Sequence, residues 1–301
     1  MPGPAMRKLI ECVPNISEGR DQRVLEAVAG AIRAVPRVRL ADIHQDPDHH
    51  RSVFTFLGPP EAVEAAALAM AGRALELIDI RTHRGVHPRI GAVDVVPFVP
   101  LEGMTIQDAV PIAHRFGRTL GERFGVPVFF YGEAALRPER RRLPDLRRGQ
   151  YEALDERLRD PASRPDAGPT GNPRSGATAV GVRGILIAFN VLLASPDVAL
   201  ARAIARKIRE SSGGLPAVQA MGVFLASQRC AQVSMNLLDY RKTSPWQVYE
   251  VIREEAARRG VAIHGAELVG LAPRPAIEEF LARGVPEFRP EQCLEHHLAQ
   301  L

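Results

Sequence analysis

The sequence predicts an α+β protein made of two ferredoxin-like βαββαβ subdomains. Three observations lead to this fold class. Strand and helix patterns alternate along the chain, the same order of elements occurs twice, and a stretch rich in Gly, Pro and Ser at 160–178 lies between the two copies. We therefore expect an N-terminal subdomain over residues 1–178 and a C-terminal subdomain over residues 179–301.

The first half contains six elements in the order βαββαβ, followed by one further helix and strand. Apolar side chains at helical spacing define its second helix, which begins with two prolines. These side chains are Val63, Ala67, Met70, Ala74 and Leu77. Strands are expected at 8–13, 38–44, 52–57, 92–98 and 126–131, and helices at 21–35, 60–78 and 105–124.

The second half repeats the βαββαβ order. Ser195 is the expected N-cap of its first helix, with Pro196 at the first helical position, and Ser244 is expected to form a capping box with Gln247 at the start of the second. Strands are expected at 184–193, 217–226, 231–240 and 261–271, and helices at 195–210 and 244–260.

Composition limits the cellular setting. The three cysteines are far apart and odd in number, which argues against a disulfide framework and favours a reducing compartment, so we expect a cytoplasmic protein. No apolar run has the length of a membrane span, and no apolar region precedes the first strand, so we expect neither a membrane partner nor a signal peptide. Met6 is an alternative start to Met1.

The formal net charge is +4, and much of the excess lies in the arginine run at 137–148. Such a run allows three interpretations: nucleic-acid binding, a solvated surface segment, or electrostatic steering of a small polyanionic substrate. The run lacks the interleaved aromatic side chains on which bases stack, so we expect no nucleic-acid partner.

The segment DIRTHRGVHPRIG at 79–91, here called the histidine loop, is the main candidate for chemistry. His83 and His87 have the spacing of a helical metal-ligand pair, but Gly85 and Pro88 oppose a helix, and no Cys or Glu stands at a ligand spacing nearby. We therefore expect no metal. Histidine acid/base catalysis is favoured, because imidazole titrates near neutral pH; a solvated loop is the alternative.

Several motifs, in order along nearly the whole chain, resemble those of the formiminotransferase domain family. They are IECVPNISEGRD (10–21), DHHRSVFTFLG (48–58), ELIDIRTHRGVHPRIGAVDVVPFVP (76–100), FGVPVFFYGEAA (124–135), GQYEAL (149–154), GATAVGVRGILIAFNVLL (176–193), AQVSMNLLDY (231–240) and ELVGL (267–271).

The resemblance implies a metal-free, homodimeric enzyme in which two α/β subdomains flank a folate-binding groove. Such an enzyme transfers a formimino group from N-formimino-L-glutamate to N5 of tetrahydrofolate, its co-substrate, in histidine degradation. The resemblance identifies His83 as the catalytic histidine, and we expect His44 to be a second, subsidiary one. The expected substrate-binding residues are Asn15, Arg51, Arg84, His87, Arg89, Gly168, Pro169, Thr170, Asn172, Arg174, Gly176 and Asn236.

The residue types suit this reaction. Attack by a folate amine on an amidine carbon needs a proton removed from one nitrogen and a proton delivered to another, and one imidazole can do both in turn. Arginines such as Arg51, Arg84 and Arg89 suit the substrates' carboxylates, because a guanidinium pairs with a carboxylate through two hydrogen bonds.

The chain departs from the family pattern close to the expected site. His44 stands where animal members have an aspartate that supports the catalytic histidine, and Val86 stands where many members have Glu. The segment 168–176 is shorter than usual, and basic residues common before residue 217 are absent. Two alternatives stay open for this reason: a divergent paralogue that transfers another one-carbon or amidine group, and a non-catalytic folate- or anion-binding protein.

Overall fold

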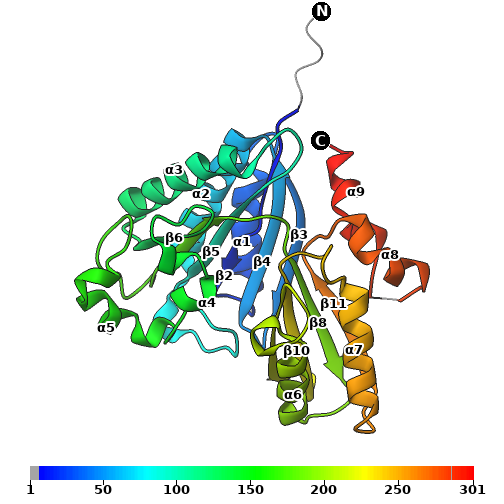
Figure 1. Cartoon of the computed structure of the whole chain (residues 1–301). Helices are drawn as coiled ribbons and strands as arrows, with labels where there is room; N and C mark the ends of the chain where they lie inside the picture. The colour runs from blue at the N-terminus through cyan, green and yellow to red at the C-terminus, as the bar shows by residue number, and fades with distance from the viewer. Residues whose placement is uncertain (1–6, 286) are drawn as a thin grey trace, which may run out of the picture. The chain divides into compact units, whose positions relative to one another are not determined.

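The computed structural model describes residues 7–285 and 287–301, and the chain divides into two compact units, one ending at Arg183 and the other beginning at Gly184 (Figure 1). Each contains one of two β-sheets, which agrees with the predicted α+β class. Strand β7 (Thr178–Val182), which spans the predicted subdomain boundary at 178, pairs within the first sheet. The alternative start at Met6 lies outside the described residues.

The described part of the first unit forms a seven-stranded mixed sheet with the order β1-β4-β2-β5-β7-β6, and β3 pairs with β4 at its side. β5, β7 and β6 run parallel, and the other pairs are antiparallel. The expected strand at 8–13 is the short strand β1, and an unexpected second short strand, β2, follows it. The remaining strands are β1 (Ile10–Cys12), β2 (Asn15–Ile16), β3 (Arg39–Asp46), β4 (Arg51–Gly58), β5 (Val93–Pro100) and β6 (Val128–Gly132).

Three helices pack into one core with this sheet: α1 (Gln22–Arg33), α2 (Pro60–Leu77) and α3 (Ile106–Phe124). Local signals place their ends. Thr105 and Asp108 form a capping box at the start of α3, and Gly125 ends it in the left-handed conformation at φ +63°. The predicted apolar face of α2 is buried except for Leu77, which is exposed.

β6 is buried on both faces, as its continuous apolar run VPVFFY indicates. Val128 and Phe130 face the helical core, and Phe129 and Tyr131 pack in a second cluster. Apolar side chains of the short helices α4 (Leu143–Leu146) and α5 (Leu154–Arg159), which the sequence analysis did not predict, complete that second cluster.

In the second unit, a four-stranded antiparallel sheet has the order β11-β8-β10-β9. Its elements follow the predicted order βαββαβ, and two short helices come after it. They are β8 (Ile187–Leu193), α6 (Val198–Ile208), β9 (Val218–Leu225), β10 (Cys230–Leu237), α7 (Pro245–Ala257), β11 (Ile263–Val269), α8 (Arg274–Ala282) and α9 (Leu294–Leu298).

One predicted helix start in this unit is wrong. Asp197, not Ser195, is the N-cap of α6, because its carboxylate accepts hydrogen bonds from the first free amides of the helix. The Ser195 hydroxyl accepts from the Asp197 amide instead. Ser244 does cap α7, accepting from the Gln247 amide. Within the described residues, no helix is long and apolar enough to cross a membrane.

Candidate active site

The histidine loop leaves α2 through a single 3-10 turn over Ile80–Thr82. Asp79 caps this turn by accepting from the Arg81 amide at 3.1 Å, and extended backbone follows at His83. Gly85 then packs against the β3–β4 connection, where a Cβ would lie 2.3 Å from the carbonyl oxygen of His49. Only glycine allows this approach, so Gly85 fixes the loop against residues 49 and 50.

His83 is buried, with 3% of its surface exposed, and both of its ring nitrogens are bonded. Nδ1 accepts from Nε of Arg89 at 3.1 Å, and Nε2 lies 2.7 Å from the carbonyl oxygen of His50. Because a guanidinium only donates and a carbonyl only accepts, Nε2 carries the proton and Nδ1 carries the lone pair. Burial lowers the pKa of His83 to about 4, and the neighbouring charges of His50 and Arg89 add to this.

Arg89 is held by a carboxylate on its other side. Its Nη1 and Nη2 each donate to Glu152 at 2.6 Å, a bidentate pair, and Nη1 also donates to Gln150 at 3.3 Å. Arg89 is buried whereas Glu152 is largely exposed on a short surface turn. The hydrogen bonds from Arg89 lower the pKa of Glu152 to about 2.

His50 lies on the opposite side of His83. The two rings stack with centroids 4.3 Å apart and planes 9° from parallel. Nδ1 of His50 lies 2.9 Å from the Arg84 carbonyl oxygen, and Nε2 lies 3.3 Å from Glu18. Burial opposes ionisation of Glu18, but hydrogen bonds from His50 and the backbone amides that follow Glu18 lower its pKa to about 2.

His87 occupies a different setting. Nη1 of Arg51 donates to its Nε2 at 2.6 Å, and its ring stacks on His49 at 5.7 Å. Burial lowers the pKa of His87 well below its usual range, and the charges of Arg51 and Arg147 add to this. His87 is therefore a neutral acceptor for Arg51 at neutral pH.

These residues share one small cleft, in which the side chains leave no room for a water molecule. It is lined by Ser17, His49, His50, Arg51, His83, His87, Arg89 and Asp94. Of the predicted site residues, the structure thus brings together Arg51, His83, His87 and Arg89. Arg84 lies next to them and is exposed, with its guanidinium on the carbonyl oxygens of Arg81 and His83.

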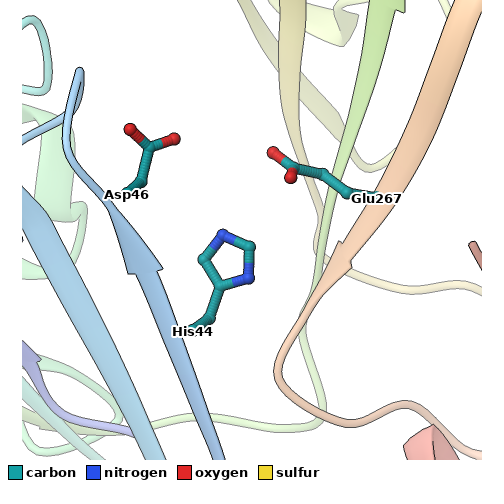
Figure 2. A group of neighbouring side chains, drawn as sticks. All are labelled: His44, Asp46 and Glu267. Atoms are coloured by element: carbon teal, nitrogen blue, oxygen red, sulfur yellow. The ribbon is translucent and has the colours of Figure 1, made fainter. Parts of the chain in front are cut away.

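His44 and Asn15 are not among the lining residues. His44 lies on β3 opposite Val53, and its side chain shares a strand face with Asp46 (Figure 2). Asn15 lies on β2, and its side chain donates to the Val13 carbonyl at 3.2 Å.

Two further polar residues belong to the second unit. Asn236 lies on β10 between Ala188 and Gln219 of the neighbouring strands. Glu267, drawn on β11 in Figure 2, accepts from Asn190 at 2.7 Å and from Gln232 at 3.1 Å.

The polar groups of the segment 168–176, here called the glycine segment, bond mainly to the backbone, both within the segment and in neighbouring parts of the chain. The Asn172 side chain donates to the Gly125 carbonyl at 2.9 Å and accepts from the amides of Arg174 and Ser175. Arg174 donates to the Glu76 carbonyl at 2.7 Å, and its own carbonyl accepts from Ile80 of the histidine loop. Pro169 and Thr170 are exposed.

The two outer glycines of this segment, Gly168 and Gly176, have positive φ and tight backbone neighbours. A Cβ on Gly168 would lie 2.1 Å from the Val126 carbonyl oxygen, and one on Gly176 would lie 2.2 Å from that of Ile90. These glycines therefore anchor the segment to the end of α3 and to the histidine loop.

Two members of the arginine run at 137–148 are structural. Arg140 is buried, pairs with Asp166 at 2.6 Å and lies over the Phe129 ring at 5.0 Å, and Arg147 pairs with Asp94. Most of the others lie on the surface. Sequence reasoning did not separate these two groups, because the run has no helical or strand periodicity.

Among the residues of this arrangement that the sequence analysis missed are Glu18, His50 and Glu152. Each lies in a motif that carries the family resemblance, but none stands near the histidine loop in sequence. The His-His doublet at 49–50 at the turn between two expected strands was the available signal, since paired imidazoles in a loop suit function better than packing.

Known proteins resemble this chain along most of its length. The model of the formiminotransferase domain, N-terminal subdomain, matches residues 9–183, and that of the formiminotransferase domain matches residues 188–282. Glutamate formimidoyltransferase of Streptococcus pyogenes serotype M1 is 40% identical over 97% of this chain and 99% of that protein. The enzyme of the same name from Thermoplasma acidophilum is 43% identical over 89% of each. Formimidoyltransferase-cyclodeaminase of Rattus norvegicus is 44% identical over 90% of this chain and 51% of that protein.

The fold and these relatives define the chain as a transferase with two α+β units. It belongs to the formiminotransferase family, so the resemblance found in its motifs is confirmed.

Proposed function

We propose that this chain transfers a formimino group from N-formimino-L-glutamate to N5 of tetrahydrofolate, in the degradation of histidine. Its relatives that are named glutamate formimidoyltransferase align over most of both chains, which supports the same reaction here. Tetrahydrofolate would serve as a co-substrate.

One observation carries the mechanistic part of this proposal: a buried imidazole with a defined lone pair stands between Arg89, which pairs with Glu152, and His50, which faces Glu18. His83 is this imidazole. A general base must be unprotonated before it reacts, and the low pKa of His83 keeps it so at neutral pH. His83 is accordingly the proposed proton shuttle.

The proposed reaction moves one proton from the folate to the departing glutamate by way of His83. N5 of the folate forms a bond to the amidine carbon and gives its proton to Nδ1 of His83. For this step, the hydrogen bond from Arg89 to Nδ1 is replaced by one from the substrate. The same proton then passes to the glutamate nitrogen as the bond between that nitrogen and the amidine carbon breaks. Glutamate leaves, His83 is again neutral, and no covalent intermediate with the protein is needed.

Basic side chains at the cleft are the proposed anchors for the substrates' carboxylates. Arg51 and Arg89 line it, and Arg84 is exposed beside it. In the structure Arg89 already binds a carboxylate, that of Glu152, in the bidentate geometry that a substrate carboxylate would use. Since the cleft has no free space, substrate binding requires some lining side chains to move.

The glycine segment is proposed to contact the folate, with Asn172 and Arg174 as side-chain contacts. Its two bonds to the histidine loop and to α2 tie it to the loop that carries His83. His44 and Asn236 are proposed to take part from β3 and β10, each within its own unit.

Four finer features also belong to this proposal. The second unit, with βαββαβ order and an antiparallel sheet, is proposed to be a ferredoxin-like subdomain. The enzyme is proposed to act as a homodimer, in the cytoplasm and without a metal, as the family resemblance implies. Light scattering of the purified protein tests the dimer, and assay after chelation tests the metal.

The decisive experiment is a spectroscopic assay for 5-formiminotetrahydrofolate with purified protein and both substrates. We expect product only when both substrates are present, and a loss of turnover in His83→Gln while the variant stays folded. Absence of product with active folate and fresh formiminoglutamate would refute the proposed reaction.

A further inference from the structure

We propose that His50 is a positioning residue for His83: its carbonyl holds the proton on Nε2 of His83, and its ring stacks on His83 as the protonated partner of Glu18. The inference rests on the proposed role of His83 as the base. Neither the motifs nor the comparisons assign a role to His50 or to Glu18.

The surroundings of the His50 ring define its protonation. Nδ1 faces the Arg84 carbonyl oxygen at 2.9 Å, and Nε2 faces the carboxylate of Glu18 at 3.3 Å. Both partners are acceptors only, so a neutral ring would place one lone pair against an acceptor. The ring satisfies both partners when each nitrogen carries a proton.

Glu18 is built to stay ionised. One of its carboxylate oxygens accepts the backbone amides of Gly19, Arg20 and Asp21 at 2.8, 2.7 and 3.0 Å. Hydrogen bonds to the charged form of a carboxylate favour that form, which agrees with its low pKa. These backbone amides, together with the hydrogen bond from His50 itself, hold the negative charge of Glu18 beside His50.

The backbone at His50 is also unusual. Its φ is +49°, in the left-handed region that residues other than glycine seldom adopt. Such a conformation costs free energy and persists where the surrounding structure enforces it, often at functional sites. Here it lets one residue place its carbonyl and its ring on the same neighbour, His83.

Two effects on His83 follow. The carbonyl of His50 selects the Nε2-protonated form, which leaves the lone pair on Nδ1 for the substrate. The charge of His50, stacked at 4.3 Å, opposes a second proton on His83 and keeps the base in its reactive form. The other groups that face this ring or line its cleft are Arg89, Glu18, His49, His87, Arg51 and Asp94.

The test is an NMR titration of the His83 ring, assigned by its absence in His83→Gln, which needs no turnover. In the wild-type protein we expect titration near pH 4. His50→Asn removes the ring and the charge, keeps the carbonyl, and tolerates the left-handed backbone. It should move the titration of His83 upward by about one pH unit, because the charge of His50 is a smaller cause of the low pKa than burial is.

His114→Asn is the matched control. His114 lies on α3, bonds the Ala134 carbonyl at 2.8 Å and contacts the Phe130 ring, but does not line the cleft. Its loss should leave the titration of His83 unchanged. An unchanged titration in His50→Asn, or an equal shift in His114→Asn, would overturn the inference.

A second measurement covers the case in which His50→Asn does not fold. The ¹⁵N shifts of the His50 ring in the wild-type protein should show two protonated nitrogens at pH 7, and Glu18→Gln should abolish this signature. A neutral His50 ring at pH 7 would refute the inference. If the assay detected no 5-formiminotetrahydrofolate while the titrations gave the expected result, the proposed reaction would be refuted and the inference about His50 would still be supported.

Discussion

The histidine loop and the glycine segment contain similar kinds of residue, yet the structure uses them in opposite ways. In the histidine loop, the rings of His83 and His87 enter a cleft with charged side chains from other segments. In the glycine segment, Asn172 and Arg174 bond backbone carbonyls nearby. The difference teaches that the side chains of a polar loop are available for proton transfer when they meet titratable groups from elsewhere in the chain. Side chains that bond only to the backbone, as in the glycine segment, stabilise the local chain path instead.

The largest expected effect concerns His83. Replacement by Gln should lower kcat by about a hundred- to ten-thousand-fold, the usual contribution of a general acid/base, while circular dichroism stays native. His87→Gln should cost less, because His87 is an acceptor for Arg51 and has no assigned proton transfer. If His87→Gln abolished turnover and His83→Gln did not, the two histidines would have to exchange roles.

The pH dependence of turnover tests how the substrate acts on this loop. His83 must be neutral to accept a proton, so kcat/KM, which reports the free enzyme, should fall only as pH drops through about 4. The substrate's carboxylates favour the charged imidazole and raise its pKa. The acid limb of kcat should therefore lie at higher pH than that of kcat/KM. Coincident limbs would mean that substrate carboxylates bind away from His83.

A smaller effect is expected in the glycine segment. Asn172→Ala removes three hydrogen bonds and should raise the KM for tetrahydrofolate more than it lowers kcat, because such contacts serve ground and transition states alike. It should also lower the free energy of unfolding by about 1–3 kcal/mol. Asn172→Asp, which keeps the acceptor oxygen, is the comparison. An unchanged KM for tetrahydrofolate together with a lower free energy of unfolding would mean that the segment only stabilises the fold.

The smallest effect is expected from the arginine run. Its surface members Arg141 and Arg148 pair with Glu133 and Asp145, so little free positive charge is left for steering. The advantage of polyglutamyl over monoglutamyl tetrahydrofolate in kcat/KM should be modest at low salt and should shrink as the Debye length falls. Equal values at every salt concentration, or salt-sensitive binding to random DNA, would exclude steering.

Much of the fold could be predicted because local patterns define it. The five long helices α1, α2, α3, α6 and α7 and most strands follow from apolar spacing and capping residues, and the structure places them within a few residues of the expected bounds. β7 escaped prediction because TAVGV is short and contains glycine, and its place between β5 and β6 depends on parallel pairing with distant segments. α4 and α5 escaped because they have too few turns for a periodic signal.

By itself, the sequence determined the repeated order of elements and the family, and it singled out His83 as the candidate base, because these inferences depend on residue types at short separations. The tertiary structure alone decided the state of that histidine. His50 stacks on His83, and it faces the carboxylate of Glu18. Glu152 acts on His83 through Arg89. These residues come together only when the chain folds back on itself, which no local spacing encodes. The pKa of a buried imidazole depends on such neighbours, and so the chemistry of His83 is a property of the folded chain.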